Sequence, residues 1–179
     1  MATRRRAALT AIICVGGIAV LGTYVHGYLT HPETAWDIWG GVPEVLRPVY
    51  SISMFSAAIG FFPFTLFILL RVDPARFRFL GGSGYGAFLV LYALMLGASA
   101  AWMPLTYAML EAPSAMLWTA ILVALSVVAL ASLGILYGLL RIEDHQPVWW
   151  YRLAVAGCVL FCWQTVVLDA IVWTYYFPM

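Results

Sequence analysis

The last apolar stretch of the chain carries the residues whose types and spacing could do chemistry. Six side chains, all polar, aromatic or sulfur-bearing, recur there at steps of four, three, four, four and three residues: Cys158, Cys162, Thr165, Asp169, Trp173 and Tyr176. In an α-helix this spacing places them on one face, and the opposite face is Val, Leu and Ile. The spacing therefore predicts a helix with a single polar stripe, which is the first candidate for a binding surface.

Asp169 is the only carboxylate well inside any predicted span. An acid within a membrane is costly and usually faces the interior of a bundle or a cavity, so it is a functional candidate. The other interpretation is structural, with a protonated or hydrogen-bonded aspartate near the end of its helix. Both interpretations stay open on the sequence alone.

A second candidate is the connection between the first two apolar stretches, which reads HPETAWDIWGGVPEVLRP. Trp36 and Trp39 lie three residues apart, so one helical turn would put both indoles on the same side. They are either interfacial belt residues or part of a short lid folded over the mouth of a bundle. About 18 residues is long for a helix–helix connection, so we expect this loop to be structured.

Known catalytic and metal-binding patterns are weak in this chain. His26 and His31 are predicted near one face of the membrane and His145 near the other, so three histidines cannot meet. Cys158 and Cys162 could hold a soft metal, but buried cysteine more often acts as a small apolar residue. The motifs G-x-S-x-G and H-E-x-x-H and the phosphate loop do not occur. We predict neither an enzyme nor a metal site.

The composition indicates which structure must position these residues. The chain has 179 residues, of which 64% are hydrophobic and 9% charged, whereas soluble domains are roughly a quarter charged. A net charge of +1 argues against nucleic-acid binding, which needs a basic surface. The chain is therefore predicted to be an all-α integral membrane protein whose main partner is the lipid bilayer.

Five stretches reach the roughly 20 apolar residues that a membrane-spanning helix needs. They cover residues 7–29, 49–70, 85–110, 115–140 and 148–177, and polar or Gly/Pro-rich segments separate them. The prediction is a five-helix bundle, forming a single transmembrane domain over residues 1–179, with a long structured first loop.

The arginines test this topology, because cytoplasmic loops are enriched in positive charge. Five spans put eight of them on one side: Arg4, Arg5, Arg6, Arg71, Arg76, Arg78, Arg141 and Arg152. Arg47 alone falls on the other side, together with Glu33, Asp37, Glu44 and Glu111. We expect a cytoplasmic N-terminus, with the C-terminus and the tryptophan-bearing loop on the opposite side.

Two further features concern helix packing. Pro63 and Pro104 interrupt the second and third spans, where they either kink the helix and open a cavity or serve only as architecture. Small residues four apart predict close helix contacts, within the chain rather than in a homodimer, although a homodimer stays open. These pairs are Ser56 with Gly60, Gly97 with Ala101, and Gly134 with Gly138.

Three short motifs resemble the tryptophan-rich sensory protein/translocator protein (TspO/MBR) family. Residues 39–50 (WGGVPEVLRPVY) are similar to a loosened form of the family's W-x-P-P stretch, and residues 101–107 (AWMPLTY) to its W-x-P-x-F-F segment. Trp163 followed by residues 168–173 (LDAIVW) resembles its W…LN-x-x-x-W ending. The chain departs from the pattern where its loop prolines are spread apart, where Trp163 lies nearer the Leu-Asp pair, and where Asp169 replaces asparagine.

The resemblance implies a ligand cavity under the first loop, in a bundle that is often dimeric. Family ligands are tetrapyrroles, such as a porphyrin or haem, and sterol-like or aromatic molecules. Carried over, Trp39 would line the lid, with Trp36 beside it in the same loop. Trp102 and Pro104 would shape the cavity wall, and Trp163 and Asp169 would form its polar side. The aspartate would favour a cationic or hydrogen-donating ligand.

We therefore expect a membrane-embedded binding, transport or sensory protein for a hydrophobic aromatic molecule. The alternative is a structural or assembly subunit of a larger membrane complex, in which the small-residue faces meet partner helices.

Overall fold

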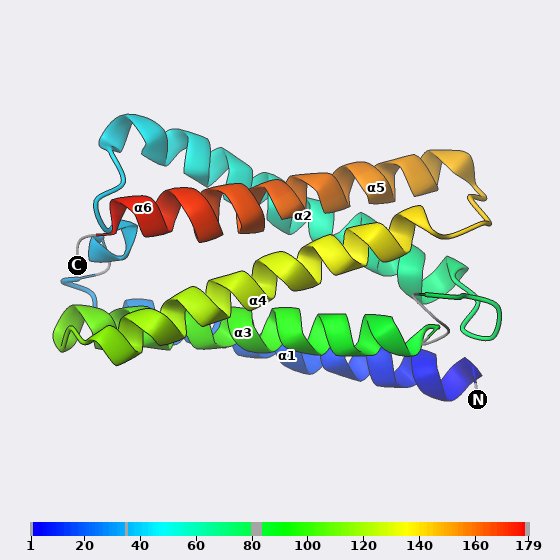
Figure 1. The fold of residues 1–179 in the computed structure, drawn as a ribbon, viewed down its shortest axis with the longest axis horizontal. Coiled ribbons are helices and arrows are strands. Elements are labelled where there is room, and N and C mark those ends of the chain that lie inside the picture. Colours follow the sequence, from blue (N-terminus) through cyan, green and yellow to red (C-terminus); the bar gives the residue numbers. More distant parts are fainter. Residues whose placement is uncertain (1, 35, 80–83, 178–179) are drawn as a thin grey trace.

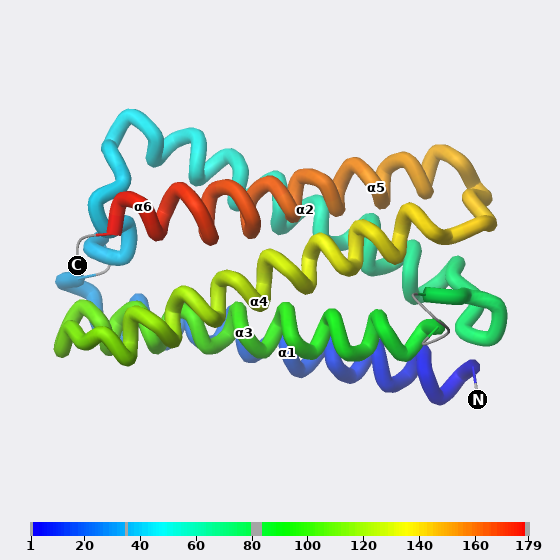
Figure 2. The backbone as a smooth tube through the Cα atoms, viewed as in Figure 1, coloured from blue at the N-terminus to red at the C-terminus, as the bar shows by residue number. Residues whose placement is uncertain are grey.

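The computed structural model describes residues 2–34, 36–79 and 84–177 as a bundle of long helices (Figure 1). The helices are α1 (Ala2–Thr30), α2 (Arg47–Arg71), α3 (Gly86–Glu111), α4 (Ala115–Leu140), α5 (Val148–Cys162) and α6 (Thr174–Tyr176). The π-helix η4 (Trp163–Trp173) joins α5 to α6, so the backbone tube runs unbroken from Val148 to Tyr176 (Figure 2). No strand occurs within those three ranges.

Five helical segments are long and apolar enough to cross a membrane, which confirms the all-α, five-span prediction. They are Ala2–Thr30, Glu44–Arg71, Gly86–Glu111, Ala115–Leu140 and Val148–Tyr176. The chain therefore has the architecture of a multi-pass membrane protein. The first helix starts nearer the N-terminus than expected, because the polar residues before Ala7 continue the helix.

The helices pack around the bundle in the order α1, α3, α4, α5, α2. Helix α1 lies along α3, and it meets the far end of α2, where Arg6 donates a hydrogen bond of 3.1 Å to the carbonyl oxygen of Val72. From there α2 runs away from α1 toward the first loop (Figure 1). At the loop end, α1 and α2 are therefore separated.

Two apolar clusters stabilise the bundle, one toward each end. The cluster at the arginine-rich end includes Phe64, Phe67, Tyr85, Phe88 and Tyr92. The cluster at the loop end joins α2, α3, α4 and η4 through Tyr50, Met109, Ile121, Leu168 and Trp173. The loop-end cluster underlies the candidate site.

Glycines bring neighbouring helices close, as the small-residue pairs predict. Gly60 of α2 faces Gly157 of α5, and a Cβ atom on either would lie within 3 Å of the other's carbonyl oxygen. Gly134 and Gly138 of α4 lie against side chains of α3. These contacts lie within one chain. Gly97 differs, because it lines an apolar groove between α1 and α3, and its missing Cβ would meet no atom within 4 Å.

Candidate functional site

The fifth span changes its hydrogen-bonding pattern where the polar stripe was predicted. From Trp163 to Trp173 it is a π-helix, a rare geometry that is frequent at functional sites. Cys158, Cys162, Thr165 and Trp173 are buried, and Asp169 and Tyr176 are partly buried, so the predicted inward face is confirmed.

The π-helix also brings a residue onto this face that α-helical spacing does not place there. Backbone hydrogen bonds in a π-helix reach five residues along the chain, so side chains five apart lie near one another. Gln164 is 6% exposed, and its Nε2 donates a hydrogen bond of 2.7 Å to Oδ1 of Asp169. The carboxyl group therefore has a neutral amide as its partner.

Tyrosines from two other helices approach Asp169. The hydroxyl groups of Tyr24 on α1 and Tyr50 on α2 lie close enough to its carboxyl group to interact with it electrostatically. Tyr50 also donates a hydrogen bond of 2.8 Å to the carbonyl oxygen of Leu168. Asp169 thus interacts with one tyrosine of α1 and one of α2 at the loop end of the bundle, and it stays partly exposed.

Aromatic rings surround this position on the α3 and α4 side. Trp102 lies between Tyr24 and Trp173, with ring centroids 6.3 Å and 5.6 Å away. Trp118 of α4 continues the cluster toward Trp173 and Phe177, at 6.3 Å and 5.3 Å. The rings form an apolar, polarisable wall beside the acid.

Two buried polar atoms in this region have no hydrogen-bond partner within the described part of the chain. One is the donor Nε1 of Trp102, and the other is the acceptor Oε1 of Gln164. Buried polar groups are nearly always hydrogen-bonded, so each unpaired group needs an explanation. We refer to Tyr24, Tyr50, Trp102, Gln164 and Asp169 together as the Asp169 centre.

The first loop lies against the C-terminal end of the fifth span. Nε1 of Trp173 donates a hydrogen bond of 3.0 Å to the carbonyl oxygen of Ile38, and the N–H of Gly41 donates one of 3.1 Å to Tyr176. Gly40 has a φ of 55°, which favours glycine, and it packs against Phe177. The loop is therefore structured, as predicted, and it is bound to the helix that carries Asp169.

The two loop tryptophans lie in different environments. A short 3-10 helix, η1 (Asp37–Trp39), follows Trp36. Trp39 packs edge-on against Tyr50, with ring centroids 6.0 Å apart, whereas Trp36 is 71% exposed. The two indoles therefore do not form one surface. Trp39 has the position expected of a lid residue above the Asp169 centre. Trp36 instead lines a hollow outside that centre.

That hollow has a volume of about 890 Å³ and opens beside the loop. Its wall includes Glu33, Asp37 and Glu111, with Trp36 and Arg47. Three of the four acidic residues assigned to one side of the membrane therefore lie together at one end of the bundle. The hollow is open, its lining mixes polar and apolar surface, and the five residues of the Asp169 centre do not line it.

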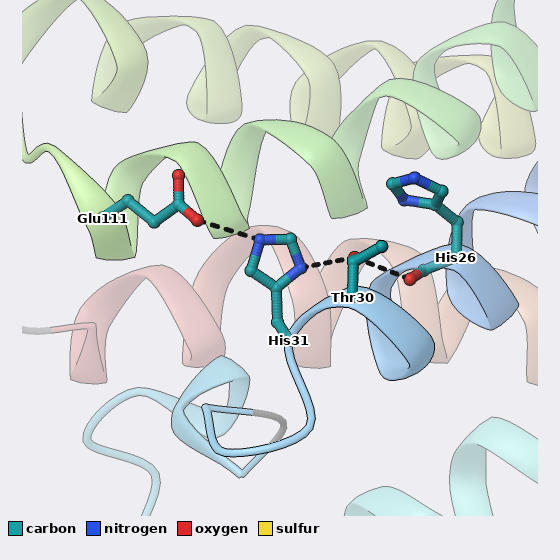
Figure 3. Close-up of polar contacts among 4 residues, drawn as sticks. All are labelled: His26, Thr30, His31 and Glu111. Atoms are coloured by element: carbon teal, nitrogen blue, oxygen red, sulfur yellow. Dashed lines mark hydrogen bonds and ion pairs between the residues drawn. The ribbon is translucent and has the colours of Figure 1, made fainter.

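A chain of polar contacts fastens the start of the loop to α3 (Figure 3). Nε2 of His31 lies 2.9 Å from Oε1 of Glu111, and its ring stacks on Tyr107 at 4.3 Å. Thr30 Oγ1 lies 2.7 Å from Nδ1 of His31, and the same hydroxyl donates to the carbonyl oxygen of His26. Because Glu111 is well exposed, the ion pair contributes no more than about 1 kcal/mol.

No family model, curated protein or solved structure matches this chain. The resemblance to the TspO/MBR family therefore stays a prediction that rests on three short motifs.

The structure places only some of the predicted site residues together. Trp102 and Asp169 lie in the Asp169 centre, and Trp39 lies next to it through Tyr50. Pro104 is exposed and Trp163 is 50% exposed, so neither is grouped with the Asp169 centre, and a role for them in a cavity wall stays a prediction. Pro104 lies two residues from Trp102, on the other side of α3, and Trp163 turns outward next to the inward-facing Gln164.

Within the described ranges, no group of three or more His, Cys, Asp or Glu side chains is placed to hold a metal ion. Cys158 and Cys162 are both buried free thiols. The chemistry available at the Asp169 centre is hydrogen bonding, charge and aromatic contact.

Proposed function

We propose that this chain binds a hydrophobic, aromatic small molecule at the Asp169 centre, in order to transport or sense it. The observation that carries the proposal is the pair of unpartnered buried atoms, Nε1 of Trp102 and Oε1 of Gln164, beside an acid. A bound molecule could satisfy both atoms, which the folded chain leaves unpaired. Binding sites of this type are mostly apolar, with a few polar groups that fix the orientation of the ligand.

The surrounding geometry also favours such a ligand. Tyr24 and Trp102 are only partly buried, although they belong to the Asp169 centre. The separation of α1 and α2 at this end would let a molecule dissolved in the bilayer approach them. Trp39 and the loop would cover the centre from the water side. The tetrapyrrole and sterol-like ligands implied by the TspO/MBR resemblance are of the right chemical kind.

Tryptophan fluorescence provides the test, because the rings of Trp39, Trp102 and Trp173 lie at or near the proposed site. Titrating the purified protein with a porphyrin should quench the emission saturably. Trp39→Ala should weaken binding several-fold, since it removes the ring that packs on Tyr50. Trp149→Phe is the matched control, because Trp149 is 68% exposed at the opposite end of the bundle.

Two results would count against parts of this proposal. Quenching that rises linearly, as it does with protein-free micelles, would remove the binding site altogether. Saturable quenching that is equal in wild type and in Trp39→Ala would remove the lid role of the loop and leave the site in place.

We also propose an orientation in which the N-terminus is cytoplasmic. The arginine-bearing segments lie at one end of the bundle, where Arg6 binds the end of α2 and Arg71 binds the carbonyl oxygen of Gln146. Positive charge favours the cytoplasmic side. A reporter that is active only in the cytoplasm should therefore work on the N-terminus and stay silent on the C-terminus. The reverse pattern would overturn the assignment.

A further inference from the structure

The carboxyl group of Asp169 has no cationic partner among the residues that the structure describes. The two ion pairs found there are His31–Glu111 and Arg76–Asp73. Arg47, the one arginine assigned to the loop end, donates to the carbonyl oxygen of Val42 and lies 6.0 Å from the ring of Trp39. A carboxylate held inside a membrane protein is costly unless a positive charge or a proton neutralises it.

The hydrogen bond between Gln164 and Asp169 uses an N–H donor of the amide and leaves acceptors of both side chains free. Gln164 turns its NH₂ group to Oδ1 of Asp169, so its own carbonyl oxygen, Oε1, is buried and unpaired. The second carboxylate oxygen, Oδ2, is a further acceptor. Two acceptors that belong to hydrogen-bonded neighbours suit a ligand that presents several N–H donors and a positive charge.

Aromatic rings next to these acceptors add to the same preference. Tyr24 and Tyr50 come from α1 and α2, and the ring of Trp102 lies 6.3 Å from that of Tyr24. The faces of tryptophan and tyrosine attract cations, and the attraction is stronger where water is excluded. The rings also provide an apolar surface for the body of a hydrophobic molecule.

We propose that the Asp169 centre selects hydrophobic amines in their protonated form. The ammonium group binds the carboxylate of Asp169 and Oε1 of Gln164, and the apolar body of the amine packs against Tyr24 and Trp102. This inference rests on the proposed function, and it names the chemical class of the molecule bound at that same site. It also explains why the chain has an acid with no cation of its own at this position.

Two pyrene probes that differ only in the polar group test the inference. Pyrenemethylamine carries an ammonium group at neutral pH, and pyrenemethanol carries a hydroxyl group. Energy transfer from tryptophan to pyrene reports binding, measured with the full chain in nanodiscs of zwitterionic phosphatidylcholine and corrected with empty nanodiscs. Wild type should bind the amine about tenfold or more tightly than the alcohol, because hydrogen bonds to charged groups are the stronger ones.

Variants of the polar groups identify the source of this selectivity. Asp169→Asn, which keeps the shape and removes the charge, should weaken amine binding about tenfold and leave alcohol binding within about twofold. Gln164→Met should weaken amine binding in the same direction by a smaller factor. Glu44→Gln is the matched control, since it removes an exposed carboxylate at the same end of the bundle, and should change neither affinity.

The possible results separate the two proposals. If neither probe binds wild type saturably, the proposed binding function is wrong. If both bind saturably with equal affinity, the function stands and the amine preference is overturned. Selectivity that survives in Asp169→Asn would also overturn it. If Asp169→Asn loses its helicity, the affinities of wild type and of Gln164→Met for the two probes still test the amine preference.

Discussion

Gly157→Val is expected to destabilise the bundle by about 3 kcal/mol or more, at or above the upper end of the usual cost of overpacking a core. A Cβ atom on Gly157 would lie 2.5 Å from the carbonyl oxygen and 3.0 Å from Cα of Gly60. Both are backbone atoms, so no side chain can turn aside to make room. Helices α2 and α5 would have to move apart, and close backbone approach is a main source of helix association in membranes.

Thermal unfolding of the detergent-solubilised protein, followed by circular dichroism, measures this effect. Gly17→Val is the control, because a Cβ atom on Gly17 of α1 would meet nothing within 4 Å. It makes the same chemical change in a helix of the same bundle. If the two variants lowered the melting temperature equally, the loss would come from the intrinsic helix preference of valine and not from the contact between α2 and α5.

The architecture could be predicted from the sequence because membrane spans depend on local properties. A run of about 20 apolar residues marks a helix wherever the chain goes next. The arginines then separate the loops into two groups, and the contacts of Arg6 and Arg71 lie at one end of the bundle, as that separation requires. The length of the stretch at residues 31–48 predicts a structured loop, and this stretch contains two short 3-10 helices before α2 begins at Arg47.

The candidate site could be predicted only in part, because its geometry depends on an irregular helix. Spacing of three and four residues correctly placed Asp169 on the inward face. It could not place Gln164, which meets Asp169 at a separation of five residues through the π-helix. One signal was available: Gln164 is the only side-chain amide within a predicted span, and polar residues within spans are functional candidates.

The outward positions of Pro104 and Trp163 have a different cause. A match of short motifs predicts which residue types correspond between a family and this chain. It does not predict how each helix is rotated about its axis. In α3 that rotation turns Trp102 toward Trp173 and leaves Pro104 exposed. In the fifth span, the transition from α-helix to π-helix at Trp163 fixes which neighbour points inward.

Trp173→Ala is the second change for which we expect a large effect, of about 2–4 kcal/mol. Replacing a buried tryptophan by alanine costs roughly 3–5 kcal/mol in soluble cores, and we expect somewhat less here because surrounding lipid is itself apolar. The ring contacts Trp102, Trp118 and Phe177, and its N–H holds the first loop at Ile38.

Trp173→Phe keeps an aromatic ring and removes the hydrogen bond, together with part of the ring volume. It should cost at least about 1 kcal/mol, the usual net worth of one hydrogen bond, plus the cost of the smaller ring, and it should speed proteolytic cleavage within the loop. Trp149→Ala, at an exposed tryptophan, should change neither the melting temperature nor the cleavage rate. If Trp173→Phe left the cleavage rate unchanged, the indole N–H would not hold the loop. The covering of the Asp169 centre would then depend on Trp39 and on the backbone bond from Gly41 to Tyr176.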